Sequence, residues 1–191
     1  MNLQPTTYNL QPNRGFTLVE TLVAIFVMMV AIVAPMSIAS QALSTARYAK
    51  EQVTAFYLAQ EGIELVRDIR GNNVISGAAV WNEGTLGLSS PGSENYCYST
   101  NGCYIEAKDL AVQNCSGICP VLNIDLNQLD PDFGIYTYSL IGTNPSQFAR
   151  TIRITKLSST EISVSSTVSW ASGAIGGTRL FTITDNLLNW Q

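Results

Sequence analysis

The sequence predicts an α+β protein in which a long N-terminal helix packs on a C-terminal antiparallel β-sheet. Three observations lead to this prediction. Residues 21–46 contain no charged side chain, residues 47–70 carry a helical stripe of apolar and small side chains, and four segments between residues 135 and 184 alternate apolar with polar side chains. Helical spacing followed by period-two alternation is typical of a helix that covers one face of a sheet. With 191 residues, the chain has room for one modest domain after the apolar run.

The apolar run begins beside a carboxylate, that of Glu20. An ionisable side chain at such a place is costly in a membrane unless it is paired, so by default it indicates function. If the chain is cut after Gly15, Phe16 acquires a positively charged amino group at the same membrane face. That amine on one subunit can pair with Glu20 of its neighbour. An ordinary secretory signal fits less well, because residues 1–15 are polar and the apolar core follows them.

Residues 14–20, Arg-Gly-Phe-Thr-Leu-Val-Glu, resemble the N-terminal signature of type IV pilins and of the related pseudopilins of type II secretion and competence systems. The family pattern is a short polar leader that ends in glycine, then phenylalanine, Thr-Leu-hydrophobic-Glu and a long apolar segment. The resemblance implies that a prepilin peptidase cuts between Gly15 and Phe16, and that the new amino group of Phe16 is N-methylated. It also implies a long N-terminal helix laid against an antiparallel sheet.

The same resemblance implies where the protein is found and what it contacts. The precursor is expected in the inner membrane as a single-pass protein with its globular part outside the cytoplasm, and the mature chain in a pilus or pseudopilus at the cell surface. Expected partners are the prepilin peptidase, the inner-membrane assembly platform, the membrane and other pilin subunits, in a homopolymer or a heteropolymer. The alternative is a permanently anchored extracytoplasmic binding or adhesion domain that does not polymerise, although such an anchor has no reason to carry Gly15-Phe16 with Glu20.

Four segments are therefore expected along the chain. They are a cleaved leader over residues 1–15, a hydrophobic transmembrane or fibre-core half-helix over 16–46, an amphipathic half-helix over 47–70 and an extracytoplasmic β-rich globular domain over 71–191. Pro35 lies in the hydrophobic half-helix, where two interpretations remain open. The proline either kinks or locally unwinds the helix, or it is tolerated, as prolines in membrane helices often are.

The amphipathic half-helix is predicted from residue spacing. Its apolar or small side chains recur at steps of three and four residues and form one stripe, at Ala55, Leu58, Gly62, Leu65 and Ile69. A glycine and two asparagines at residues 71–73 are typical of a helix end, so the helix is expected to stop at Arg70. The stripe is the expected cover for the apolar face of the sheet.

The C-terminal third of the chain is predicted to be β-structure. Period-two alternation marks strands at residues 135–141, 148–157, 161–170 and 179–184. Their short, turn-rich connections predict an antiparallel meander. The segment from Ile162 to Trp170 also resembles the Ile-x-Val-x-x-x-Val-x-Trp strand of a group of minor pilins. Residues 74–132, rich in Gly, Ser and Asn, show no pattern that predicts a fold.

The chain has four cysteines and no histidine. Outside the cytoplasm, an even number of cysteines within a short window predicts disulfides. The favoured pairing is local, Cys97 with Cys103 and Cys115 with Cys119, because Asn101-Gly102 is a strong turn signal. A nested pairing of Cys97 with Cys119 remains open. A zinc site is less favoured, since the Cys-x₂-Cys spacing and any histidine ligand are missing.

Composition argues against several other functions. Without histidine, His-based triads and His acid–base catalysis are excluded, and no glycine-rich phosphate loop is present. A net charge of −4 without clustered Lys and Arg argues against nucleic-acid contact. Asp125, Asp130 and Asp132 with Asn127 could form an oxygen cage for calcium, although their spacing matches no EF-hand. We therefore expect a structural subunit with no catalytic residues, cofactor or established metal site.

Overall fold

The structure is a computed structural model. It describes residues 15–77, 81, 96–127, 133–173 and 176–189. The chain divides into two compact units, Met1–Leu43 and Ser44–Gln191. Helix α1, Leu18–Ile75, begins in the first unit and ends in the second.

In the first unit, α1 is an apolar helix whose described side chains are all exposed. The helix continues unbroken through Pro35. Of the two interpretations for this proline, toleration therefore agrees with the structure and local unwinding does not. A proline removes one backbone hydrogen bond, and in a helix of 58 residues the bonds on either side remain.

The C-terminal end of α1 lies beyond the predicted end at Arg70. Gly71 is helical, and α1 stops only before Gly77, whose φ is +70°. The amide of Gly77 donates to the carbonyl of Val74 at 3.2 Å. A glycine in the left-handed region is the usual residue after a helix end, because it lacks the Cβ that would clash there. The prediction was wrong because it took the first of two glycines for the stop.

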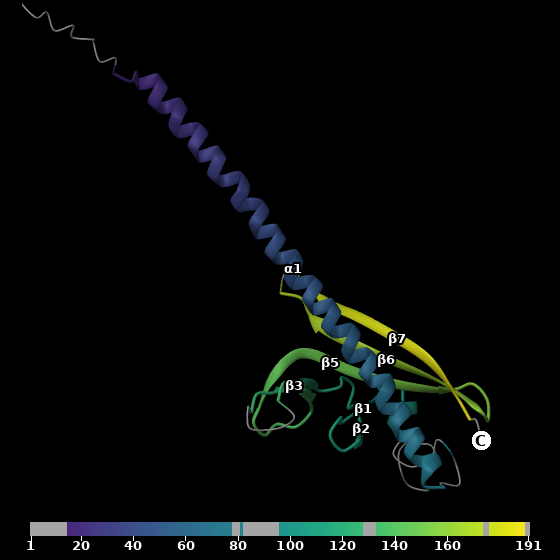
Figure 1. Ribbon diagram of the computed structural model, residues 1–191. Coiled ribbons are helices and arrows are strands. Elements are labelled where there is room, and N and C mark those ends of the chain that lie inside the picture. The colour runs from purple at the N-terminus through teal and green to yellow at the C-terminus, as the bar shows by residue number, and fades with distance from the viewer. Residues whose placement is uncertain (1–14, 78–80, 82–95, 128–132, 174–175, 190–191) are drawn as a thin grey trace, which may run out of the picture. The chain divides into compact units, whose positions relative to one another are not determined.

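Among the described residues, seven strands form one antiparallel sheet (Figure 1). The order is β2-β1-β5-β3-β4, and β6 pairs with the other edge of β5 and carries β7. A short 3₁₀ helix, η2, precedes the sheet. The bounds are η2 Tyr96–Tyr98, β1 Cys103–Ile105, β2 Val112–Asn114, β3 Val121–Asp125, β4 Tyr136–Thr137, β5 Thr143–Lys156, β6 Glu161–Ala171 and β7 Thr178–Leu188.

The predicted meander is confirmed for β5, β6 and β7 and is wrong before them. Only Tyr136 and Thr137 of the predicted strand 135–141 are in a strand, and they pair with β3. β5 begins at Thr143, inside the predicted turn. The Thr143 hydroxyl donates to the Ser139 carbonyl at 2.7 Å, so a local side-chain bond competes with the ladder there. β1, β2 and β3 were not predicted, because such short strands show too little alternation.

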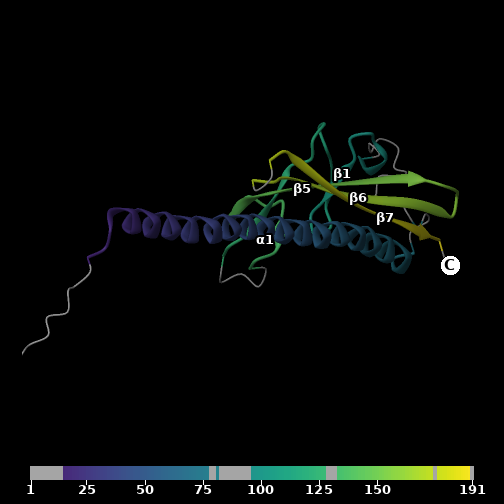
Figure 2. The ribbon, with the colours of Figure 1, turned by 90° about the horizontal axis from the view of Figure 1, so that it is seen from above.

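The core of the second unit lies between the C-terminal part of α1 and one face of the sheet. In Figures 1 and 2, this part of α1 runs along β5, β6 and β7. All five stripe positions predicted between Ala55 and Ile69 are buried. The sheet contributes alternate residues of β5 and β6, as the alternation predicts. These are Ile152, Ile154, Ile162, Val164 and Val168. The predicted α+β fold, a long N-terminal helix on an antiparallel sheet, is confirmed.

Candidate functional site: the N-terminal motif and the helix–sheet junction

The residues of the predicted cleavage site precede α1. Gly15 and Phe16 lie outside the helix, and Phe16 is 81% exposed. A Cβ built on Gly15 would meet no atom within 4 Å. The chain's own described structure therefore leaves room for a larger residue at position 15, and a requirement for glycine there would come from another molecule.

Thr17 caps the N-terminus of α1. Its hydroxyl oxygen accepts the backbone N–H of Glu20 at 3.2 Å, which satisfies one of the unpaired donors in the first turn. Sequence reasoning gave Thr17 no separate role, although a threonine three residues before a glutamate at the start of an apolar run is a helix-start signal.

Glu20 is the third residue of α1 and is exposed. In the part of the chain that the structure describes, its carboxylate has no hydrogen-bond or ion-pair partner. A carboxylate in the first turn is favourable next to the positive end of the helix dipole. The side chain is thus free to contact a second molecule.

The family model described as the prokaryotic N-terminal methylation motif matches residues 10–34. No curated protein and no solved structure matches the chain. The protein therefore carries the prepilin signal of type IV pilins, and its fold is consistent with the pilin-like family. The motif points to a structural, non-enzymatic protein whose general partners are other pilin subunits and the prepilin peptidase. Among the described residues, α1 is the one helix that is long and apolar enough to cross a membrane, which suggests a membrane-anchored pilin precursor.

The four cysteines form two local disulfides, Cys97–Cys103 and Cys115–Cys119. This is the favoured pairing, and the nested one is wrong. The Asn101-Gly102 turn brings the first pair together, with Gly102 at a φ of +75°. All four sulfurs are used, so no thiolate is left to bind zinc.

A buried arginine joins α1 to the sheet. The Arg150 side chain on β5 is fully buried, and its Nη1 atom donates to Glu61 Oε2 at 2.8 Å and to the Leu58 carbonyl at 3.3 Å. Its Nη2 atom donates to the Ile105 carbonyl on β1 at 3.2 Å. Sequence reasoning missed this role. The available signal was spacing, because Arg150 is in phase with the inward-facing Ile152 of the same strand.

α1 lies very close to the sheet at Gly62. A Cβ on this residue would overlap Ser166 Oγ on β6 and lie 3.1 Å from Arg150 Cδ. Ser166 is itself fully buried, in a row otherwise made of large apolar side chains. Gly62 on α1 and Ser166 on β6 thus face each other, and their small size allows the helix backbone to lie close to the sheet.

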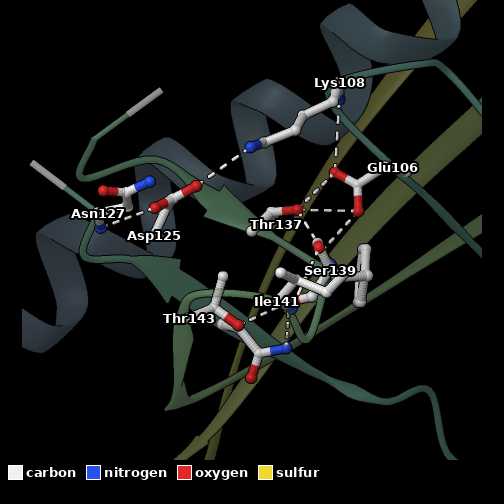
Figure 3. Close-up of polar contacts among 10 residues, drawn as sticks. Glu106, Lys108, Asp125, Asn127, Thr137, Ser139, Ile141 and Thr143 are labelled. Atoms are coloured by element: carbon white, nitrogen blue, oxygen red, sulfur yellow. Dashed lines mark hydrogen bonds and ion pairs between the residues drawn. The ribbon is translucent and has the colours of Figure 1, made fainter. Parts of the chain in front are cut away.

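A second polar network holds the loop between β4 and β5 (Figure 3). Both carboxylate oxygens of Glu106 accept the Thr137 hydroxyl, at 2.9 and 3.0 Å, and one also accepts the Tyr138 amide at 2.7 Å. The Thr137 hydroxyl oxygen in turn accepts the Ser139 amide at 3.0 Å. The network fixes a loop whose two apolar side chains, Leu140 and Ile141, are 83% and 89% exposed. No local sequence pattern predicts it.

Of the residues considered for calcium, the structure describes Asp125 and Asn127, whereas Asp130 and Asp132 lie outside the described residues. One Asp125 oxygen accepts the Asn127 amide at 3.0 Å and the other accepts Lys108 Nζ at 3.1 Å. These two interactions, the amide first, lower the pKa of the Asp125 carboxyl below its ordinary value. The negative charge of Asp125 is thus already balanced by the positive charge of Lys108. No group of three His, Cys, Asp or Glu side chains that could hold a metal occurs within the described part of the chain.

Proposed function

We propose that the protein is a structural subunit of a type IV pilus or pseudopilus, most simply a minor pilin or pseudopilin. One observation carries the proposal: the N-terminal methylation motif leads directly into the apolar, exposed part of α1. A signal of this kind has a purpose only if the chain is cut before this helix and the helix then packs with other subunits in a fibre.

Processing takes place between Gly15 and Phe16, and the new amino group of Phe16 is N-methylated. The open surroundings of Gly15 support a role in recognition, because its own chain would accept a Cβ there. A peptidase that grips the backbone closely at the scissile bond excludes one.

Assembly then uses the apolar half of α1. In the precursor this half spans the inner membrane, with the globular part outside the cytoplasm. An assembly platform extracts the mature chain, and the apolar halves of neighbouring subunits pack into the fibre core. Extraction is energetically tolerable because the apolar surface exchanges lipid for neighbouring helices. The carboxylate of Glu20 pairs with the Phe16 amine of the adjacent subunit and sets the register between them.

The first experiment tests processing. In the native host, the mature protein is expected to begin with N-methylated Phe16, as read by intact mass and N-terminal peptide analysis. Gly15→Val is expected to leave the uncut precursor in the membrane, whereas Thr17→Ser, which keeps the capping hydroxyl, is expected to be cut normally. Mature protein of normal length from Gly15→Val contradicts the proposal.

The second experiment tests assembly. Glu20→Ala removes a charge from the apolar segment, so the precursor is expected to insert and to be cut as well as the wild type. Its incorporation into sheared fibres is expected to fall, because the Phe16 amine loses its partner. Equal incorporation of both proteins would refute the pairing. Normal processing without any incorporation of the wild type would favour the permanently anchored binding or adhesion domain.

A further inference from the structure

Positive side chains gather where α1 leaves its apolar run. The charge-free segment ends at Ala46, and Arg47 and Lys50 follow within the next turn. Arg179 at the start of β7 lies over the ring of Tyr48, with its guanidinium carbon 6.0 Å from the ring centroid. We call Arg47, Lys50 and Arg179 the basic collar.

The described residues give the collar no carboxylate partner. Among the described residues, none of its three cations forms an ion pair, although Arg67, Lys108 and Arg150 each do. The nearby acid on α1 is Glu51, and its carboxylate accepts the indole N–H of Trp170 at 3.3 Å. Three cations without an ion pair therefore lie close together in the second unit, in a chain whose net charge is −4; Arg70, Arg153 and Lys156 are the other described cations without one.

Two of these cations line a groove. Arg47 and Lys50 stand at the edge of a space of about 390 Å³ between α1 and the sheet. The lining also includes the polar residues Glu51, Thr54, Ser146 and Gln147 and the apolar or aromatic residues Ile124, Tyr136 and Phe148. The Thr54 hydroxyl already donates to the Lys50 carbonyl at 3.0 Å, so the guanidinium of Arg47 and the ammonium of Lys50 are the groups that suit the oxygens of a phosphate group.

We propose that the basic collar binds the phosphate groups of anionic phospholipids at the outer face of the inner membrane. This inference rests on the proposed function, because it requires the apolar run to lie in the membrane. The run then ends at Ala46, and the collar lies at the level of the lipid phosphates. Basic side chains close to a membrane surface are attracted to anionic lipids over about a Debye length.

Processing makes the collar more prominent. Cleavage after Gly15 removes Arg14, so the basic side chains that flank the apolar run in the mature chain are those of the collar. Lys and Arg usually concentrate on the cytoplasmic side of a membrane segment. Their place on the opposite side needs a local reason, and lipid phosphate supplies one.

The test uses the mature full chain in lipid nanodiscs, either of phosphatidylcholine alone or of phosphatidylcholine mixed with phosphatidylglycerol. Binding to the folded state raises the midpoint of thermal unfolding. We expect the anionic lipid to raise it by about 4 °C, and we expect added salt to reduce this gain. Lipid phosphorus retained through detergent purification gives a second measurement that does not depend on unfolding.

The variants are matched in charge. Arg47→Gln with Lys50→Gln is expected to abolish most of the gain and to reduce the retained anionic lipid severalfold. Arg153→Gln with Lys156→Gln removes two exposed cations from β5 and is expected to keep the full effect. Equal losses in the two double variants, or none in the first, overturn the inference. Inorganic phosphate that gives the same gain in phosphatidylcholine discs also overturns it, because the ligand is then a free anion.

Failure of the inference is distinguishable from failure of the proposed function. Resistance of the precursor to alkaline extraction from membranes and an N-terminal Phe16 in the mature chain test the latter. If both hold and anionic lipid has no effect, only the lipid-binding collar is wrong.

Discussion

At the scale of single residues, Gly62 sets how closely α1 lies on the sheet. Gly62→Ala adds a Cβ that overlaps Ser166 Oγ, so the helix or β6 must shift. Overpacking costs about 1–3 kcal/mol of folding stability. The better helix propensity of alanine offsets about 1 kcal/mol of this loss. We expect a net loss of stability, measured by denaturant unfolding of the full chain in detergent.

Gly71 provides a matched control on the same helix. A Cβ there meets nothing within 4 Å, so Gly71→Ala is expected to stabilise the protein by about 0.5–1 kcal/mol. Adding Ser166→Ala to Gly62→Ala removes the overlapping oxygen and is expected to restore much of the loss. A Gly62→Ala protein as stable as Gly71→Ala would show that the close approach carries no strain.

Tyr138 makes stability depend on pH in the alkaline range. Burial raises the pKa of its hydroxyl from 10.0 to about 12, because the phenolate would lose its hydration. The folded state therefore prefers the neutral phenol. The stability that this preference contributes is fully present below about pH 10 and is lost as the pH rises through about 12.

Absorbance at the phenolate band, combined with unfolding midpoints, tests this expectation. We expect one tyrosine to ionise near pH 12 in the folded protein, and we expect Tyr138→Phe to lose that step and to weaken the alkaline destabilisation. Tyr57 is 65% exposed, so Tyr57→Phe is the control and is expected to keep both the ionisation step near pH 12 and the alkaline destabilisation. An unchanged titration in Tyr138→Phe would contradict the assignment.

At the scale of elements, the ion pair between Glu61 and Arg150 ties α1 to β5. Glu61→Ala leaves a fully buried guanidinium without its carboxylate, which is expected to cost about 2–4 kcal/mol. Glu64 lies one turn away and pairs with Arg67 at the surface. Because exposed pairs contribute little, Glu64→Ala is expected to cost about 0.5 kcal/mol or less. Chemical denaturation of both variants provides the measurement, and similar losses would mean that the buried pair contributes no more than the exposed one.

The elements also differ in how well the sequence predicts them. α1 and the β5–β7 meander were predicted because each repeats its pattern over many residues. β1 buries Cys103 and Ile105 and β2 buries none of its residues, and in strands of three residues alternation cannot be distinguished from chance. The end of α1 was misplaced because Gly71 and Gly77 look alike in sequence, and only the backbone shows which one adopts the left-handed conformation.

At the scale of the whole molecule, α1 serves two units with different surroundings. Its apolar part is exposed through Leu43, whereas the stripe from Ala55 to Ile69 is buried against the sheet. A shortened chain that begins at Ser44 retains this stripe and both disulfides, and is expected to be soluble, monomeric and cooperative in thermal unfolding. One that begins at Gly77 exposes the apolar face of the sheet and is expected to aggregate.

Size-exclusion chromatography and calorimetry of the two shortened chains provide the measurement. Both shortened chains are exported to the oxidising periplasm of an expression host, so that both form the same two disulfides. If the shorter chain unfolds as cooperatively as the longer one, the sheet does not depend on α1 for its core.

By itself, the sequence determined the N-terminal motif, the apolar run and the helical stripe, and it favoured the local disulfides without excluding the nested pairing. Each of these depends on the order and spacing of residues close together in the chain. Only the tertiary structure decided that Glu106 holds Thr137, that Arg150 lies beneath α1 and that β5 stands between β3 and β6. Glu61 and Arg150 are 89 positions apart. A contact of this kind forms only when the chain folds, because folding brings the two residues together, and the buried guanidinium then needs a partner in place of water.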